Sequence, residues 1–392
     1  MKKRWFIVFA VALAAVVAVA LLRRRAAPEP VYQGKSVTAW VRDLSSPDGA
    51  VRSNATVALQ ALGTNGIPSL VRTLERRDPI YKKPFLSLVP RLPLWVRRSF
   101  LRRLKPFDAS NDRLAAASAL LALGTNAPAA PLVKALHDPE KQVAVQAATA
   151  LGKIGRPAVP DLIRALNDGD GYVRSMACYA LGLIGPAATE AAPALIRRFT
   201  DSYANVPEQS GYALFRIGPP AIPALIESLQ NPDGRIRARS ARALVWMGPQ
   251  VKEFAPALIE AAKDPQWTVR QYSVEVLGNV GPFSPKAIAA LAAALQDGHA
   301  EVRLKAAEGL GRATRFATSA IPELTAALGD KESQVRGAAA EALGRIGPAA
   351  RPSATALSEK LKDEDETVRT RAREALKTIE PDGAPSPSPE TE

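Results

Sequence analysis

An aspartate and an arginine six residues apart recur along the chain, and their types and spacing are the first to suggest chemistry. A carboxylate that faces a guanidinium invites a catalytic interpretation. Because the pair returns in successive repeats, we instead expect a structural role, in which charge-assisted hydrogen bonds tie turns together along or between repeats. The pairs are Asp168/Arg174, Asp264/Arg270, Asp297/Arg303, Asp330/Arg336 and Asp363/Arg369.

Residue types that usually carry catalysis or bind metal are scarce. The chain has two histidines, His137 and His299, and one cysteine, Cys178, which excludes an intramolecular disulfide and argues against a zinc site or a Cys/His catalytic pair. The glycines recur at a fixed period as helix stops, and no phosphate-binding loop, GxSxG elbow or dinucleotide fingerprint is present. We therefore predict that the protein is not an enzyme and needs no cofactor or metal.

A 33-residue period organises most of the chain. Val-Arg pairs stand at 269, 302, 335 and 368, and the template reads V-R-x-x-A-x-x-A-L-G-x-I-G-P, then P-x-L-x-x-A-L-x-D. Apolar positions three and four apart, followed by Gly-Pro stops, predict pairs of helices. A period of this length predicts an all-α solenoid in which no pair buries its apolar face alone. The second helix of each pair should begin near residues 51, 112, 143, 173, 206, 236, 269, 302, 335 and 368, which gives about ten helix pairs.

This template resembles the HEAT repeat, specifically the short bacterial HEAT-like repeat of the phycobilisome-lyase type. Residues 173–188, 302–311 and 335–350 carry the resemblance, which extends from about 36 to 379. It implies a right-handed α-α superhelix and leaves the binding role open. Deoxyhypusine hydroxylase has similar repeats and a di-iron site built from His-Glu pairs. Here Asp138 and Ala300 follow the two histidines, so the resemblance does not extend to that activity.

Three positions depart from the template and put single Asp–Arg contacts in doubt. Residues 112–113 read Asp-Arg, Ala144 replaces the arginine, and Pro207 stands where another arginine is expected. None of them conflicts with the fold. We predict one solenoid over residues 36–380, with a basic, aromatic insertion at 79–108 and a disordered tail rich in Pro, Ser and Glu at 381–392.

The N-terminal residues 1–25 combine basic ends with an apolar run from Trp5 to Leu22. A helix of that length spans ~27 Å, just enough for the hydrocarbon core of a membrane. We expect an uncleaved single-pass anchor, followed by a short linker at 26–35. A cleaved signal peptide is the alternative, although leucines and arginines directly follow its only small-x-small site. Basic residues flank both ends of the run, so the positive-inside rule gives only a lean toward an exocytoplasmic solenoid.

The formal net charge of +14 is concentrated near the N-terminus. Residues 1–25 carry a net charge of +6 and residues 75–108 carry +7, whereas residues 109–392 are balanced, so we expect no nucleic-acid partner. Aromatic and basic residues interleave at 81–107, which favours either a helix lying among lipid headgroups or a lid packed on the first repeats. The residues predicted to contact a membrane surface are Trp95, Arg97, Arg98, Phe100, Arg102 and Arg103.

The third and sixth residues after the valine that opens each second helix should face the concave surface. Near the middle of the array these positions are aromatic and basic, as interface anchors often are. Ordinary exposed side chains are the alternative interpretation. The predicted partner-binding residues are Met176, Tyr179, Tyr212, Arg239, Arg242 and Tyr272.

Together these features predict a non-catalytic, membrane-tethered scaffold that binds a protein or peptide through its concave face. Two alternatives stay open. One is a lyase- or isomerase-like accessory enzyme that acts on the prosthetic group of a partner protein, by family analogy alone. The other is a module that binds a lipid surface through residues 81–107.

Overall fold

The computed structural model describes residues 29–44, 46–77, 109–280 and 284–380, most of which are helical. The chain divides into two compact units, residues 1–154 and residues 155–392. Several predicted features lie outside the described residues: the membrane anchor at 1–25, the insertion at 79–108 with Trp95, Arg97, Arg98, Phe100, Arg102 and Arg103, and the tail at 381–392.

The first unit opens with a feature that the helical prediction missed. A two-stranded antiparallel hairpin, β1 (Val31–Tyr32) and β2 (Lys35–Ser36), occupies part of the predicted linker. Gln33 and Gly34 both take positive φ angles, as a tight two-residue hairpin turn requires. The indole of Trp40 donates a hydrogen bond to the carbonyl of Tyr32 at 3.0 Å, which attaches the hairpin to the first helix.

The rest of unit 1 alternates shorter and longer helices, with 3-10 turns between them. Its helical elements are α2 (Val37–Asp43), α3 (Gly49–Leu62), η1 (Gly63–Gly66), α4 (Ile67–Leu74), α7 (Ala109–Leu123), η4 (Gly124–Asn126), α8 (Ala129–Ala135) and α9 (Lys141–Ile154).

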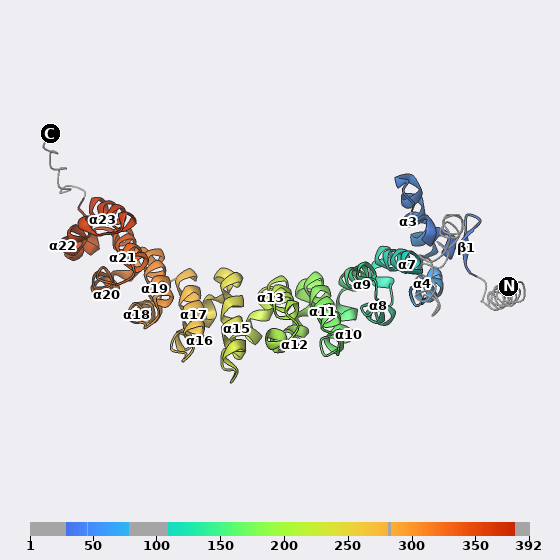
Figure 1. The fold of residues 1–392 in the computed structure, drawn as a ribbon, viewed down its shortest axis with the longest axis horizontal. Helices are drawn as coiled ribbons and strands as arrows, with labels where there is room; N and C mark the ends of the chain where they lie inside the picture. The colour runs from blue at the N-terminus through green and yellow to red at the C-terminus, as the bar shows by residue number, and fades with distance from the viewer. Residues whose placement is uncertain (1–28, 45, 78–108, 281–283, 381–392) are drawn as a thin grey trace, which may run out of the picture. The chain divides into compact units, whose positions relative to one another are not determined.

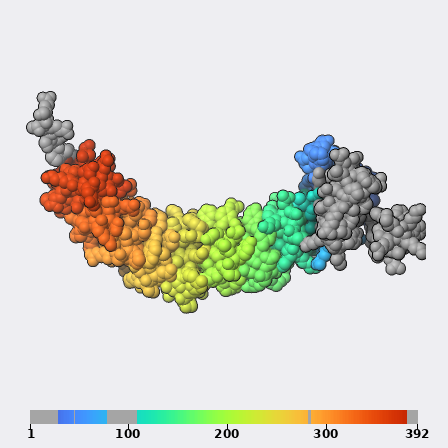
Figure 2. Space-filling view, in the orientation of Figure 1, coloured from blue at the N-terminus to red at the C-terminus, as the bar shows by residue number. Residues whose placement is uncertain are grey.

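Unit 2 continues this alternation, and each helix pair lies against the next, from green to red in Figures 1 and 2. In Figure 1 the long odd-numbered helices form one layer, and the short even-numbered helices form the other. Its elements are η5 (Arg156–Ala158), α10 (Val159–Ala165), α11 (Gly171–Ile184), η6 (Gly185–Ala191), α12 (Ala192–Arg197), η7 (Arg198–Thr200), α13 (Asn205–Ile217), η8 (Pro219–Ala221), α14 (Ile222–Ser228), α15 (Gly234–Met247), η9 (Gly248–Phe254), α16 (Ala255–Ala261), α17 (Trp267–Asn279), α18 (Pro285–Ala294), α19 (Ala300–Ala313), η10 (Thr314–Ala320), α20 (Ile321–Ala327), α21 (Ser333–Ile346), η11 (Gly347–Ser353), α22 (Ala354–Glu359), η12 (Lys360–Lys362) and α23 (Glu366–Ile379).

The described residues thus contain the predicted helix pairs, each made of a short first helix and a longer second helix. Alanine, leucine and valine form the core between them. The valines that open the long helices are fully buried at Val173, Val206, Val269 and Val302. Alanines at the fifth and eighth template positions have small side chains, so neighbouring long helices can approach closely and pack without voids.

One described stretch, Gly171–Thr200, is apolar and long enough to cross a membrane by length and composition. It contains two consecutive helices, α11 and α12, rather than one span. Gly185 ends α11 with φ of +68°, and η6 then connects to α12. More than half of its apolar window, 56%, is already buried inside the protein. This stretch is therefore accounted for by the packing of a repeat.

The recurring arginines bond to the following repeat as well as to their own turn. Arg303 donates from Nε and Nη2 to the two carboxylate oxygens of Asp330 at 2.6 and 2.9 Å, and from Nη1 to the carbonyl of Asp297 at 2.9 Å. The predicted structural role of the Asp–Arg pairs is confirmed, and the carboxylate comes from the turn of the next repeat. We call this contact a rung. The other rungs are Arg113/Asp138, Arg174/Asp201, Arg237/Asp264, Arg270/Asp297 and Arg336/Asp363.

The rungs also set the ionisation of their carboxylates. At Asp330, burial raises the pKa, but hydrogen bonds from Arg303 and from the backbone N–H of Glu332 outweigh burial and hold the pKa below its ordinary value of 3.8. At Asp363, the hydrogen bond from Arg336 is the largest cause of a lowered pKa. These carboxylates are therefore ionised at neutral pH and satisfied by their arginines.

The three departures from the template have different outcomes. Arg113 forms a rung, with its Nε 2.6 Å from Asp138, so the doubt about that position was wrong. Ala144 supplies no guanidinium, and the chain divides into its two units after this helix, at Ile154. Pro207 supplies none either, and the matching aspartate position in the next turn is Asn231. These last two repeats are 30 residues long instead of 33.

Candidate partner-binding surface

Three of the six predicted binding residues come together on α13 and α15. Tyr212 on α13 is 47% exposed. Arg239 and Arg242 on α15 both reach toward Glu208 on α13, with Nη1–Oε2 and Nη2–Oε2 distances of 3.1 and 3.8 Å. The other three predicted residues are half-buried on the neighbouring long helices: Met176 and Tyr179 on α11, and Tyr272 on α17.

Two aromatic residues that the sequence prediction missed complete this cluster. Phe215 on α13 is 44% exposed and Trp246 on α15 is 47% exposed. The ring of Phe215 lies 6.5 Å from that of Tyr212 and 6.3 Å from that of Trp246, which it meets edge to face. The guanidinium of Arg242 lies 5.5 Å from the Trp246 ring, within cation–π range. We call the six residues the α13–α15 patch: Glu208, Tyr212, Phe215, Arg239, Arg242 and Trp246.

The exposed rings coincide with a change at position 9 of α13, counting the opening valine as position 0. Elsewhere in unit 2 that position is often a glycine, which lets the next long helix come close: a Cβ added to Gly278 would lie only 2.6 Å from the Cα of Gly309. Gly182, Gly311 and Gly344 show the same close approach, with backbone atoms of the next helix 2.9–3.3 Å from an added Cβ. Phe215 stands at this position in α13. In unit 2, α13 and α15 are also the least closely packed consecutive long helices.

The residue at position 10 of α15 also differs from those of α19 and α23, where position 10 contacts the position-9 glycine of the preceding long helix. Arg312 Nε donates to the carbonyl of Gly278, and Thr378 Oγ1 donates to the carbonyl of Gly344, both at 3.0 Å. These bonds tie adjacent long helices together at the glycine. At the same place in α15 stands Trp246, which packs against Phe215 instead. The junction between α13 and α15 therefore has an exposed aromatic pair in place of this interhelical hydrogen bond.

The junction also lacks a rung, because Pro207 and Asn231 occupy both of its positions. Asn231 keeps the turn role of the aspartates: its side chain accepts from the N–H of Asp233 at 2.9 Å, and its carbonyl accepts from Arg237 at 2.8 Å. It lacks the carboxylate that a rung needs. The connection after α13 is short as well, since η8 has 3 residues where η6, η9, η10 and η11 have 7.

The α13–α15 patch has a net positive charge. Arg239 and Arg242 share the single carboxylate of Glu208, whose side chain is 57% exposed. The patch therefore carries two guanidinium groups against one carboxylate, and both guanidinium groups lie on the helix that bears Trp246.

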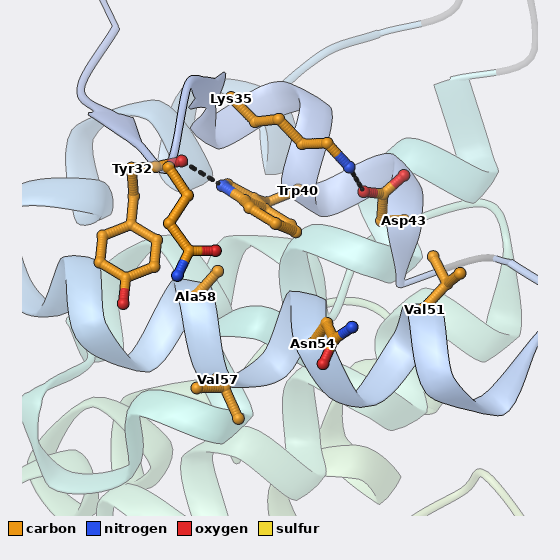
Figure 3. A pocket seen from close by; sticks show the side chains of 9 residues that line it. Tyr32, Lys35, Trp40, Asp43, Val51, Asn54, Val57 and Ala58 are labelled. Carbon is orange, nitrogen blue, oxygen red and sulfur yellow. Dashed lines mark hydrogen bonds and ion pairs between the residues drawn. The ribbon is translucent and has the colours of Figure 1, made fainter.

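A pocket of about 220 Å³ in unit 1 is a second candidate site (Figure 3). Trp40 lies between the hairpin and α3, and Lys35 sits over its ring with Nζ 4.5 Å from the ring centre. The same Nζ forms an ion pair with Asp43 at 2.8 Å. Because the indole N–H and both charged groups already have partners, this pocket presents less unused binding capacity than the α13–α15 patch.

The side chains with the greatest reactive potential are not arranged for chemistry in the described part of the chain. No group of three or more His, Cys, Asp and Glu side chains there is placed to hold a metal ion. Burial raises the pKa of the Cys178 thiol to about 12, so it stays protonated at neutral pH. His299 stacks on Trp267, with ring centres 4.9 Å apart, at the turn before α19.

Segments from 129 to 377 match a known family model. Residues 129–214, 200–278, 222–311 and 288–377 each match the model for HEAT repeats. No curated protein matches this chain.

Among solved structures, the karyopherin Kap121p bound to the extreme C-terminus of the protein phosphatase Cdc14p is similar to this chain. The identity is 13%, the match covers 89% of this chain and 42% of that chain, and the TM-score is 0.54, which indicates a shared fold. An engineered protein matches at 21% identity over 88% of this chain and 98% of that chain, with a TM-score of 0.41. Human deoxyhypusine hydroxylase in complex with glycerol matches at 25% identity over 85% and 99%, with a TM-score of 0.30.

Proposed function

Because this chain belongs to the HEAT-repeat family, we propose that it is a scaffold that binds a protein partner through the α13–α15 patch and catalyses no reaction. The observation that carries the proposal is the clustering of Tyr212, Phe215 and Trp246, three exposed rings beside two arginines. Tyrosine, tryptophan and arginine dominate the energetics of protein interfaces, especially where they gather in one place.

The similar karyopherin supports a protein ligand as the most direct choice. Its structure contains a segment of another protein, the extreme C-terminus of Cdc14p. Two observations support a role without catalysis. The carboxylates and guanidinium groups of the rungs are paired with each other, and Cys178 is buried and protonated.

We further propose that the scaffold is tethered to a membrane by residues 1–25 and faces the exocytoplasmic side, and that its repeats are of the short bacterial phycobilisome-lyase type. The apolar run from Trp5 to Leu22 supports the tether. Alkaline extraction of membranes tests it: the full chain should stay in the pellet, and a chain lacking residues 1–25 should be released. Release of both chains would contradict the tether, and protease added to intact cells would report the side.

Site-specific photocrosslinking tests the proposed binding surface. A photoreactive phenylalanine analogue placed at Tyr212 should give a discrete crosslinked protein in the native cell. The matched control is the same analogue at Phe316, which is 50% exposed on η10, outside the patch. Equal crosslinking at both positions, or none at Tyr212, would contradict partner binding by the patch.

A further inference from the structure

The junction between α13 and α15, which we call the open junction, supplies the apolar half of a recognition site. Phe215 and Trp246 come from consecutive long helices and meet edge to face, yet each keeps nearly half of its surface exposed. Such rings gain most from burial when a bulky apolar side chain covers them, because apolar area removed from water is favourable. The rings belong to ordered helices, so a ligand would lose little free energy in ordering them.

The arginines supply the polar half. Arg239 and Arg242 are about one-third exposed, at 33% and 37%, and both depend on one solvent-exposed partner, Glu208. A guanidinium binds a second carboxylate readily, because it presents several N–H donors in a planar fork.

We propose that the α13–α15 junction binds an acidic peptide segment of a partner protein. A bulky apolar side chain of the peptide packs on Phe215 and Trp246, and flanking carboxylates bind Arg239 and Arg242. This inference rests on the proposed function and specifies the chemistry of its partner.

Charge argues against the most obvious other occupant, a second copy of this chain. A two-fold contact places the same patch on both sides of the interface. Here it would bring the arginines of the two copies face to face, and like charges across an interface are costly. An acidic segment has the opposite sign and avoids this cost.

The test uses the full chain in detergent and two labelled ten-residue probes. Each probe has a central Leu-Phe pair in a Gly/Ser background; one carries four glutamates and the other four lysines. Fluorescence anisotropy should give roughly tenfold tighter binding of the acidic probe at moderate salt, with the difference shrinking as salt rises.

Variants assign the binding to the two halves of the site. R239E combined with R242E should reverse the preference between the probes, and F215G should weaken the acidic probe roughly tenfold, because it removes a buried ring contact. The matched control is K331E combined with K377E, two exposed lysines on other turns and helices. It changes the net charge equally and should leave the preference intact.

Equal binding of the two probes, no binding of either probe, or unchanged acidic binding by the R239E/R242E variant would overturn the inference. So would a control variant that loses the preference, because general charge would then explain it. Crosslinking at Tyr212 separates this failure from failure of the proposed function. If that crosslink forms while the acidic probe fails, the patch binds a partner of other chemistry; if both fail, both proposals fall.

Discussion

The junction between α13 and α15 and the junctions from α17 to α23 come from one template but are built differently. The closed junctions have a rung and, at α17–α19 and α21–α23, a position-9 glycine whose carbonyl is bonded by the next helix. The open junction replaces these parts with Pro207, Asn231, Phe215 and Trp246. The comparison teaches that a repeat protein can make a distinct surface by removing the contacts that hold its repeats together. Because every repeat presents similar helices, a site becomes specific only where the template is broken.

Acidification should have the largest effect on the closed junctions, because it acts on several rungs at once. The folded protein lowers the pKa of Asp201, Asp297, Asp330 and Asp363. A lowered pKa means that the carboxylate stabilises the fold above its ordinary pKa of 3.8 and ceases to do so as the pH falls through the native pKa. We expect urea unfolding, followed by circular dichroism, to show a loss of stability below pH 3.8 that exceeds the effect of any single substitution.

A matched variant sharpens this experiment. D330N installs at a closed junction the residue that the open junction has at Asn231. The variant should be less stable at neutral pH and should lose less stability on acidification, since one titrating carboxylate is gone. If the pH dependence of the variant equalled that of the original protein, the rung at Asp330 would not be a source of acid sensitivity.

Removing a rung arginine should have the next largest effect. R303A leaves the carboxylate of Asp330 without its guanidinium, at a site where that side chain is only 9% exposed. Breaking a buried ion pair in this way typically costs about 3–5 kcal/mol. Native-state hydrogen exchange should show that loss in α19 and α21, the helices that the rung joins.

Its control is K263A, which removes an ion pair of Lys263 with Glu260 whose side chains are 67% and 66% exposed. Exposed pairs contribute about 0–1 kcal/mol. Equal effects of the two substitutions would mean that the rungs do not hold the closed junctions together.

Adding one methyl group should distinguish the two kinds of junction by the sign of its effect. At Gly278 a Cβ would meet backbone 2.6 Å away, so G278A should destabilise the protein by about 1–3 kcal/mol through overpacking. At Gly211, near the open junction, a Cβ would meet only the rings of Phe199 and Trp246 at 3.8 Å. G211A should therefore stabilise helix α13 by about 0.5–1 kcal/mol, because alanine is the better helix former. Thermal unfolding should lower the midpoint temperature of G278A and raise that of G211A. Midpoints that move in the same direction would contradict the difference in packing.

The sequence predicts the periodic part of this molecule well and its exception less well. The 33-residue period places the helix pairs and the Asp–Arg contacts, because each template residue has one physical role repeated many times. Positions 3 and 6 include Tyr212, Arg239 and Arg242, which the structure places on α13 and α15, and partner binding by them stays a prediction. Phe215 and Trp246 stand at positions 9 and 10, so the same reasoning does not select them. The signal was a phenylalanine at the template glycine, and its consequence depends on the distance between two helices, which a single sequence does not state.

The smallest net change in stability is expected from rebuilding a rung at the junction between α13 and α15. P207R supplies the guanidinium and N231D supplies the carboxylate, 24 residues apart in a repeat of 30. Arg113 and Asp138, 25 residues apart, show that a short repeat can still form the contact. Each single variant introduces an unpaired charge, so neither alone should stabilise the protein. The double variant should exceed the sum of the singles by about 1 kcal/mol, the range of coupling between residues in contact. Phe215 still separates the helices, so adding F215G should raise that coupling, since glycine lets α15 approach. A coupling near zero in both backgrounds would mean that the shortened η8 connection, rather than the lost side chains, keeps this junction open.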